Sequence, residues 1–528
     1  MSRRQLLALI GQSGGAGAMY FAMSALGYAA ESNYRGPVSL SGAPRGQSVL
    51  ILGAGMAGLV AAYELKNAGY QVRVLEYNDR AGGRSWTLRG GDTYTELGGA
   101  TQRCEFDPGL YINPGPWRIP YHHHGVLDYC NRLGVALEPF IQVNYNAYLH
   151  SQKAYGGRPQ RIRAVQADFH GHVAELLGKA ITSKGLDQSV SREDGEKLLE
   201  ALKAWGALDE NNRYSASFGS SMRRGFDTDP GGGLMPAARF SPPGDFRELI
   251  QSGLWQYLRV GADYEFQSTI FQPVGGMDRI PAAFQQHVGE LIRFNSKVTE
   301  IKQDATGVTA HYVDRKSGGA VMSARADWCV CTIPLSILSQ IPVNVSAAMT
   351  AAIQAVPYEA TVKVGLQFKR RFWEEDERIF GGITYTDLPI GVISYPSTGY
   401  GSRGKGVLLG AYAWGPAAYE LTAKSPPERV QWAMRLGAQI HPQYLQEFET
   451  GVAVGWHRVP WVNGCFGNWS DQARAQHYAN LCAIDGRIVL AGEHASYLPA
   501  WQEGAVLSSL DAITRLHAKI VAWGGKAS

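Results

Sequence analysis

The stretch SVLILGAGMAGLVAAYELKNAGYQVRVLEYNDRAGGR, residues 48–84, decides the fold class of this chain. Within it, the apolar run Val49–Leu52 predicts a buried parallel strand, Leu59–Asn67 a helix, and Gln71–Glu76 a second strand. A strand–helix–strand unit of this kind is typical of α/β proteins with a doubly wound, mostly parallel sheet.

Three glycines in GxGxxG spacing fall on the turn between the first strand and the helix. Gly53 allows the tight turn, Gly55 lets the backbone approach a pyrophosphate, and Gly58 lets the helix pack close to the strand. Glu76 follows 18 residues after Gly58, where a carboxylate can accept ribose hydroxyls and would repel a 2′-phosphate. A turn that serves packing alone is the alternative, but the βαβ context and Glu76 favour a dinucleotide site.

A second glycine pair, Gly82-Gly83, precedes Arg84 just after the second strand. We expect Arg84 to clamp the pyrophosphate, because a guanidinium can bind it bidentately. A solvated loop arginine is the alternative.

Composition describes an ordinary globular protein of 528 residues, with 45% hydrophobic and 18% charged residues. The net charge of +4 and the absence of a basic cluster argue against nucleic acid as a partner. Six cysteines form no CxxC pair, so neither a zinc site nor a disulfide framework is expected, and we predict no metal.

The first 46 residues resemble a signal segment followed by a linker. Ser2-Arg3-Arg4 begins a twin-arginine-like motif, and the stretch to Ala30 is too polar for a membrane span. Export and a retained helix are the two alternatives; without export the protein would be cytoplasmic.

The rest of the chain divides by pattern. We predict a discontinuous nucleotide-binding domain, a second domain with a mixed sheet, and a helical and loop insertion at 161–269 between them. The expected ranges are 47–120, 270–335 and 460–528 for the first domain, and 121–160 and 336–459 for the second.

Five landmarks together resemble the flavin-containing amine oxidases, and within them the L-amino-acid oxidases. The first is the dinucleotide unit. The others are Pro114-Gly115-Pro116-Trp117-Arg118-Ile119-Pro120, Gly275-Gly276-Met277-Asp278, the strand around Lys363 with Tyr395-Pro396 beyond it, and Ala491-Gly492-Glu493-His494 followed by Trp501-Gln502-Glu503-Gly504-Ala505.

The resemblance implies a Rossmann-type FAD domain, similar to the GR2 class, joined to a mixed-sheet substrate domain. FAD would be held non-covalently. It would contact residues of the glycine-rich turn, the second landmark and the last strand: Gly53, Gly55, Met56, Ala57, Gly58, Glu76, Gly83, Arg84, Gly115, Trp117, Arg118, Val298, Glu493, Trp501, Gln502 and Ala505.

The same resemblance assigns the residues around the substrate. Arg118 would bind the substrate carboxylate in a fork, which its planar guanidinium suits. Arg103 competes for this role, and an Arg118 satisfied by local carbonyls or FAD phosphate is the structural alternative. Tyr395 would add a hydrogen bond to the carboxylate, and Trp501 one aromatic wall beside the flavin; core packing is the alternative for both.

Lys363 resembles the family lysine that holds a water near the flavin and assists reoxidation; a lysine facing solvent is the alternative. Cys465 lies in a setting similar to the flavin-linked cysteine of monoamine oxidases, with a buried inert thiol as the preferred interpretation. His122-His123-His124 predicts the start of a helix rather than a metal site.

The expected activity is the oxidative deamination of L-amino acids by oxygen, yielding 2-oxo acids, ammonia and hydrogen peroxide. An L-amino-acid 2-monooxygenase, an amine oxidase and a non-catalytic FAD-binding module are the alternatives. The pocket shows no clear acidic partner in the sequence, which favours bulky apolar substrates. A homodimer is expected.

Overall fold

A six-stranded sheet forms the centre of the computed structural model, which describes residues 32–183, 185–186 and 190–524. Neighbouring strands are parallel except for one antiparallel edge pair. In spatial order the strands are β12 (Ile292–Arg293), β2 (Gln71–Leu75), β1 (Ser48–Leu52), β16 (Trp328–Cys331), β23 (Ile488–Leu490) and β22 (Ile484–Asp485). The predicted α/β class is confirmed.

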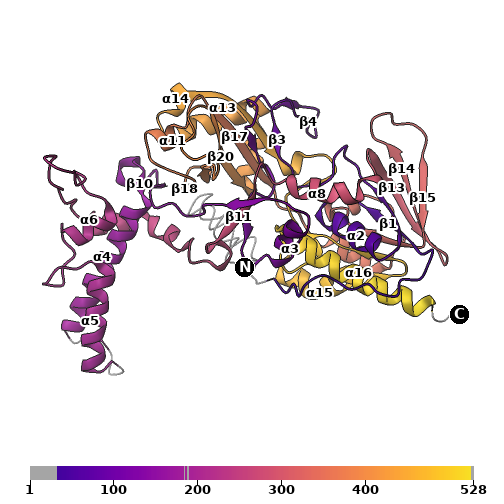
Figure 1. Cartoon of the computed structure of the whole chain (residues 1–528), viewed down its shortest axis with the longest axis horizontal. Coiled ribbons are helices and arrows are strands. Elements are labelled where there is room, and N and C mark those ends of the chain that lie inside the picture. Colours follow the sequence, from indigo (N-terminus) through magenta and orange to yellow (C-terminus); the bar gives the residue numbers. More distant parts are fainter. Residues whose placement is uncertain (1–31, 184, 187–189, 525–528) are drawn as a thin grey trace.

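The first strand and helix form as the local pattern predicts. Residues 49–52 of β1 are fully buried because sheet neighbours and packed layers cover both faces. Helix α2 (Met56–Asn67) begins three residues earlier than predicted, directly after Gly55. It packs with the C-terminal helix α16 (Gln502–Gly524) on one face of the sheet (Figure 1).

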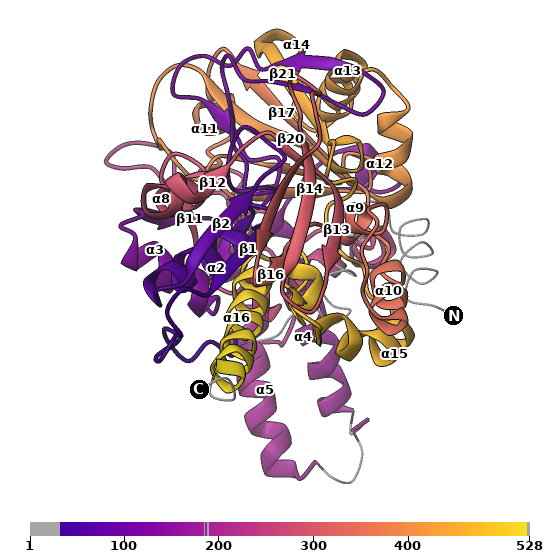
Figure 2. The ribbon, with the colours of Figure 1, turned by 90° about the vertical axis from the view of Figure 1, so that its right-hand side faces the viewer.

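The opposite face of the sheet packs against an antiparallel meander and several helices (Figure 2). The meander pairs in the order β13 (Ser296–Gln303), β14 (Val308–Asp314) and β15 (Met322–Ala326). The helices on this side are α9 (Leu335–Leu338), α10 (Ala347–Gln354) and α15 (Asp471–Cys482).

A second, mixed sheet of seven strands lies beside the first. Two neighbouring strands, β20 (Gly406–Trp414) and β17 (Thr361–Phe368), are buried along their whole length. In spatial order the strands are β10 (Gln160–Arg161), β9 (Tyr148–His150), β18 (Ile383–Thr386), β19 (Val392–Ser394), β20 (Gly406–Trp414), β17 (Thr361–Phe368) and β21 (Phe448–Gly455). The accompanying helices are α11 (Phe372–Glu375), α12 (Gly415–Thr422), α13 (Pro426–Gly437) and α14 (Tyr444–Glu447). The domain boundaries proposed from the sequence stay a prediction.

The predicted insertion contains an arm of helices that projects from the body (Figure 1). Its helices are α4 (Ile162–Thr182), α5 (Arg192–Gly206), α6 (Phe218–Arg224) and α7 (Phe246–Ser252). The chain returns to the body through the short turn η3 (Tyr264–Phe266).

Short elements connect the two sheets. Helix α3 (His124–Arg132) begins at the histidine run, as predicted, and α8 is Arg279–Val288. The strand pairs are β3 (Leu88–Arg89) with β6 (Tyr111–Ile112), β4 (Thr93–Thr95) with β5 (Thr101–Arg103), and β11 (Ile270–Pro273) with β7 (Ile119–Pro120) and β8 (Leu137–Pro139).

The twin-arginine-like motif lies outside the described residues. Among the residues that are described, we find no helix with the length and apolarity needed to cross a membrane.

Candidate active site

One large cavity runs between the two sheets, with an empty volume of about 1640 Å³ that includes space open to solvent. Its lining includes the turn after β1, side chains from β20 and the loop before α16. It brings together almost all of the residues expected to contact FAD: Gly53, Gly55, Met56, Ala57, Glu76, Gly83, Arg84, Gly115, Trp117, Arg118, Val298, Glu493, Trp501, Gln502 and Ala505.

The glycines after β1 differ in what surrounds them. Gly53 has φ +105°, which favours glycine. A Cβ on Gly58 would lie 1.9 Å from the carbonyl oxygen of Gly53, so Gly58 serves close packing rather than the cavity wall. A Cβ on Gly55 would meet nothing within 4 Å, and no side chain caps the helix that begins there. Open space and uncapped N–H groups therefore coincide at Gly55, as a phosphate needs.

Glu76 lies at the end of β2 and is buried. Its carboxylate accepts hydrogen bonds from the Ala54 N–H (2.6 Å) and from the backbone and side chain of Asn78 (2.8 and 2.9 Å). Burial raises the pKa of this carboxyl, and the three donors oppose the rise. The carboxylate thus ties the glycine-rich turn to the neighbouring strand at the cavity wall.

Arg84 and Glu493 form an ion pair in the lining of the cavity. Nη1 of Arg84 donates to Oε1 of Glu493 (2.7 Å) and to the carbonyl oxygen of Cys465 (2.6 Å). Glu493 also accepts from the Gly467 N–H (3.2 Å). Arg84 is therefore not a solvated loop arginine.

Arg118 is buried in the lining of the same cavity. It is 4% exposed, and Nη1 donates to Oε1 of Gln142 (2.9 Å). The guanidinium carbon lies 4.5, 5.0 and 5.8 Å from the ring centroids of Phe266, Trp117 and Trp501. Its competitor Arg103 is exposed on β5 and does not line the cavity, so the structure favours Arg118.

Lys363 is buried in β17 rather than facing solvent. Nζ donates to the carbonyl oxygen of Gly115 (2.5 Å) and lies 4.5 Å from the ring centroids of both Trp117 and Tyr412. Burial lowers the pKa of Lys363 well below its usual value, which favours the neutral amine. Lys363 therefore lies directly behind the wall that Gly115, Trp117 and Tyr412 form.

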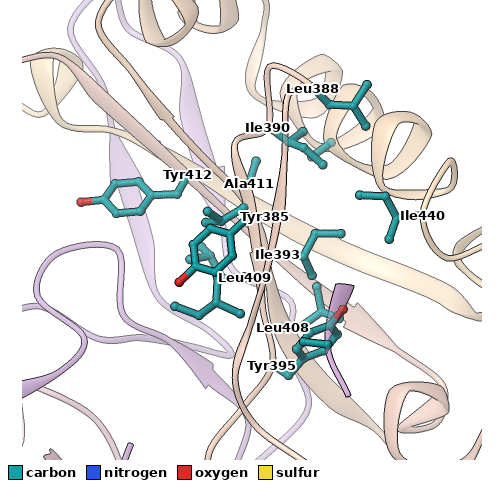
Figure 3. Close-up of a cluster of buried hydrophobic side chains, with 14 of the residues drawn as sticks. Tyr385, Leu388, Ile390, Ile393, Tyr395, Leu408, Leu409, Ala411, Tyr412 and Ile440 are labelled. Carbon is teal, nitrogen blue, oxygen red and sulfur yellow. The ribbon is translucent and has the colours of Figure 1, made fainter. Parts of the chain in front are cut away.

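Tyr395 does not share this cavity with Arg118. It is 1% exposed, and its hydroxyl is hydrogen-bonded to Oγ1 of Thr384 (2.8 Å) and Nε2 of His441 (2.6 Å). The rings of Tyr395 and Tyr412 lie apart in Figure 3. The expectation that Tyr395 lies beside Arg118 is therefore not met, because Tyr395 packs inside the seven-stranded sheet's core.

Tyr412 and Trp414 on β20 line the cavity instead, and the sequence analysis missed both. Their rings lie 4.5 Å apart, and Trp117 lies 5.7 Å from Tyr412. Tyr412 pairs with Lys363 across the antiparallel strands β17 and β20. Only the register of β20 against its neighbours shows which of its aromatic residues faces the cavity.

Glu265 is a second residue that the sequence analysis missed. It lies in η3, is 2% exposed and lines the cavity beside Arg118 and Trp501. The expectation of a pocket without an acidic partner is therefore wrong. Nothing in the local pattern of η3 signals a buried carboxylate, since a lone glutamate is usually exposed.

Residues 56–516 match the pattern of the family described as flavin containing amine oxidoreductase. The chain belongs to this family. The L-amino-acid oxidase of Siganus canaliculatus is 29% identical over 481 residues, covering 89% of this chain and 85% of the relative. The L-amino-acid oxidase of Protobothrops flavoviridis is 30% identical over 474 residues, covering 88% and 87%.

A solved structure of cyclohexylamine oxidase from Brevibacterium oxydans IH-35A has a TM-score of 0.59 and 16% sequence identity, covering 90% of this chain and 99% of that one. This similarity shows the shared fold. The protein is thus a flavoprotein oxidoreductase of the amine oxidase fold, and its cofactor is FAD.

The cavity of this amine oxidoreductase fits FAD. Open space at Gly55 next to an uncapped helix accepts a pyrophosphate, and the carboxylate of Glu76 lines the same cavity, where a ribose can contact it. Cys465 lines the cavity, and burial raises the pKa of its thiol. A raised pKa disfavours the thiolate that a bond to flavin needs, which supports non-covalent binding.

Proposed function

We propose that this protein oxidises L-amino acids, converting them to 2-oxo acids and ammonia with release of hydrogen peroxide. The observation that carries the proposal is the buried guanidinium of Arg118 in the lining of the cavity. A planar guanidinium in a substrate pocket suits a carboxylate, and an amino acid brings a carboxylate beside its amine.

The residues around Arg118 would orient the substrate. Arg118 holds the carboxylate, while Trp501 and Tyr412 flank the space between it and the rest of the cavity. When bound, FAD supplies the two-electron oxidation of the Cα–N bond and passes the electrons to oxygen. The rings and the buried guanidinium would orient the substrate so that its single Cα–H bond faces the cofactor.

Tyr412 is the residue we assign the second contact with the carboxylate, in place of Tyr395. It faces the same cavity as Arg118, and it packs against Trp117, the residue before Arg118. Its place opposite Lys363 fixes it on a rigid pair of strands.

The relatives named L-amino-acid oxidases, at 29% and 30% identity over most of the chain, support an amino-acid substrate. The structural neighbour named cyclohexylamine oxidase keeps a simple amine as the second candidate. Arg118 favours the amino acid, because a simple amine has no carboxylate to pair with it. An L-amino-acid 2-monooxygenase would use the same contacts but yield an amide and carbon dioxide.

The test is anaerobic mixing of the purified holoenzyme with each of the twenty L-amino acids, followed by the flavin absorbance. Bleaching by L-amino acids, but not by their D-enantiomers or by the matching decarboxylated amines, is the expected result. Bleaching by the decarboxylated amines alone would contradict the proposal. Under air, 2-oxo acid and peroxide are expected as products; an amide would assign the monooxygenase reaction instead.

A further inference from the structure

Glu265 has an unsatisfied carboxylate oxygen at the substrate end of the cavity. Oε1 of Glu265 is buried and has no hydrogen-bond partner among the described residues. A buried acceptor without a partner costs stability unless a ligand satisfies it. Since Glu265 lines the same end of the cavity as Arg118, that ligand shares the site with the carboxylate.

The charged and titratable groups around Glu265 come from separate segments of the chain. The charge of Arg118 lowers the pKa of Glu265, and the charge of Asp263 raises it. Oδ2 of Asp263 lies 3.9 Å from Nε of Arg259. His122 stacks on Tyr264, and His123 packs against Trp501 with its pKa lowered by burial. On β17, burial favours the neutral form of Lys363. Arg118 is thus the main cation facing Glu265, and burial raises the pKa of Glu265 to about 8.

An amino acid entering this site creates two electrostatic problems. Its carboxylate, once paired with Arg118, would lie near the negative charge of an ionised Glu265. Its ammonium must lose a proton, because the nitrogen lone pair is needed before Cα can be oxidised. One proton transfer resolves both problems.

We propose that Glu265 accepts the ammonium proton of the bound L-amino acid, an inference that rests on the proposed function. One N–H bond breaks and an O–H bond forms at Oε1, while the electron pair stays on nitrogen and nothing is oxidised or reduced. Before transfer the four groups carry two positive and two negative charges. Afterwards only Arg118 and the substrate carboxylate are charged, so the net charge of these four groups is zero before and after the transfer.

This role predicts a distinct pH dependence. Glu265 must be ionised in the free enzyme and the substrate must be protonated, so productive binding rises with pH through the pKa of Glu265 near 8. Without Glu265, only substrate that already carries a neutral amine in solution reacts. Productive binding then rises with pH through the pKa of the ammonium group of the free substrate instead.

The first experiment measures anaerobic flavin reduction by L-phenylalanine across pH in the wild type, Glu265→Gln and Glu265→Asp. For Glu265→Gln we expect a loss of about 100-fold in the apparent second-order rate near pH 8 that shrinks at higher pH, and partial recovery in Glu265→Asp. Glu200→Gln, which neutralises an exposed carboxylate on α5 outside the cavity, is the matched control and should keep the wild-type profile. Identical profiles in wild type and Glu265→Gln would overturn the inference.

The second experiment needs no turnover. Benzoate offers a carboxylate without an amine, and its binding is read from the flavin absorbance. In the wild type its affinity should fall tenfold per pH unit above about pH 8, because ionised Glu265 lies near the same guanidinium. Affinity in Glu265→Gln should be flat. A flat wild-type curve would overturn the inference even if the variant failed to fold.

Two further outcomes are distinguishable. A loss in Glu265→Gln confined to lysine and arginine as substrates would assign Glu265 to side-chain recognition and overturn its role as proton acceptor. If no L-amino acid bleaches the flavin of the wild-type enzyme, the proposed function itself is wrong, whatever the benzoate titration shows.

Discussion

Arg118 is held in a fixed orientation at the cavity. Three aromatic rings surround the guanidinium, and one of them belongs to Trp117, the residue before Arg118. Ring faces attract a cation, and Nη1 also donates a hydrogen bond to the side-chain oxygen of Gln142. These contacts fix the orientation of the guanidinium.

Replacing Arg118 with Met should therefore weaken L-amino acid binding by about 2–5 kcal/mol, or roughly 30-fold or more in the dissociation constant. Arg103→Met, which removes an exposed arginine on β5, is the matched control and should change nothing. Rapid-reaction titration of flavin reduction gives the dissociation constant directly. An Arg118→Met enzyme with unchanged affinity would show that another group binds the carboxylate.

A second residue-scale prediction concerns the buried ion pair of Glu96 and Arg429. Both side chains are 1% exposed, and Nη1 and Nη2 of Arg429 each donate a hydrogen bond to the Glu96 carboxylate at 2.8 Å. Arg429→Met removes both close hydrogen bonds of the buried Glu96 and leaves only Arg458, at 3.9 Å, as a cation beside it. The free energy of unfolding should therefore fall by about 3 kcal/mol.

The exposed pair of Lys66 and Glu290 provides the matched comparison. Urea unfolding measures the free energy of unfolding of both Arg429→Met and Lys66→Met. Lys66→Met should cost about 0–1 kcal/mol. Equal costs for the two substitutions would mean that burial of the Glu96–Arg429 pair has no energetic consequence.

At the scale of the element, the turn before α2 separates packing from cofactor binding. Gly58→Ala would place a methyl group 1.9 Å from a carbonyl oxygen, so we expect loss of stability in apoprotein and holoenzyme alike. Gly55→Ala adds a methyl group where no protein atom lies within 4 Å. It should leave the apoprotein's unfolding midpoint unchanged and weaken FAD binding, because the pyrophosphate needs that space.

Thermal unfolding with and without added FAD, and FAD titration by fluorescence, distinguish the two variants. A Gly55→Ala protein with normal FAD affinity would show that the pyrophosphate does not approach this backbone.

Local pattern was sufficient to predict β1, α2 and β2, because a turn, a helix and two strands close in sequence follow from their own residues. It was not sufficient for Tyr412 or Tyr395. Which tyrosine faces Arg118 depends on the register of β17, β19 and β20, set by pairing between distant segments. Glu265 was missed for the same reason, since its burial follows from how the chain returns from the arm of α4–α7.

At the scale of the whole molecule, buried histidines make stability depend on pH. His441 and His494 are 0% and 1% exposed, and burial lowers the pKa of each to about 4. The pKa in the unfolded chain is about 6.5. The unfolded state therefore binds more protons below that value, so stability is fully present above pH 6.5 and is lost as pH falls toward 4.

Between pH 6.5 and pH 5 each histidine should cost about 1–2 kcal/mol of unfolding free energy. Urea unfolding of the holoenzyme at fixed FAD concentration measures this loss. Constant stability across that interval would mean that these rings accept protons without unfolding.

The two sheets contribute differently to the cavity. Loops at the ends of parallel strands in the six-stranded sheet hold the glycine-rich turn, whereas Tyr412 and Trp414 come from β20 of the seven-stranded sheet, and Glu265 from the turn η3. Substitutions in β20 and η3 can therefore change the substrate while leaving the glycine-rich turn intact. Among the descendants of a duplicated gene, we expect differences in substrate to follow substitutions in these two elements, and the glycine-rich turn to be retained.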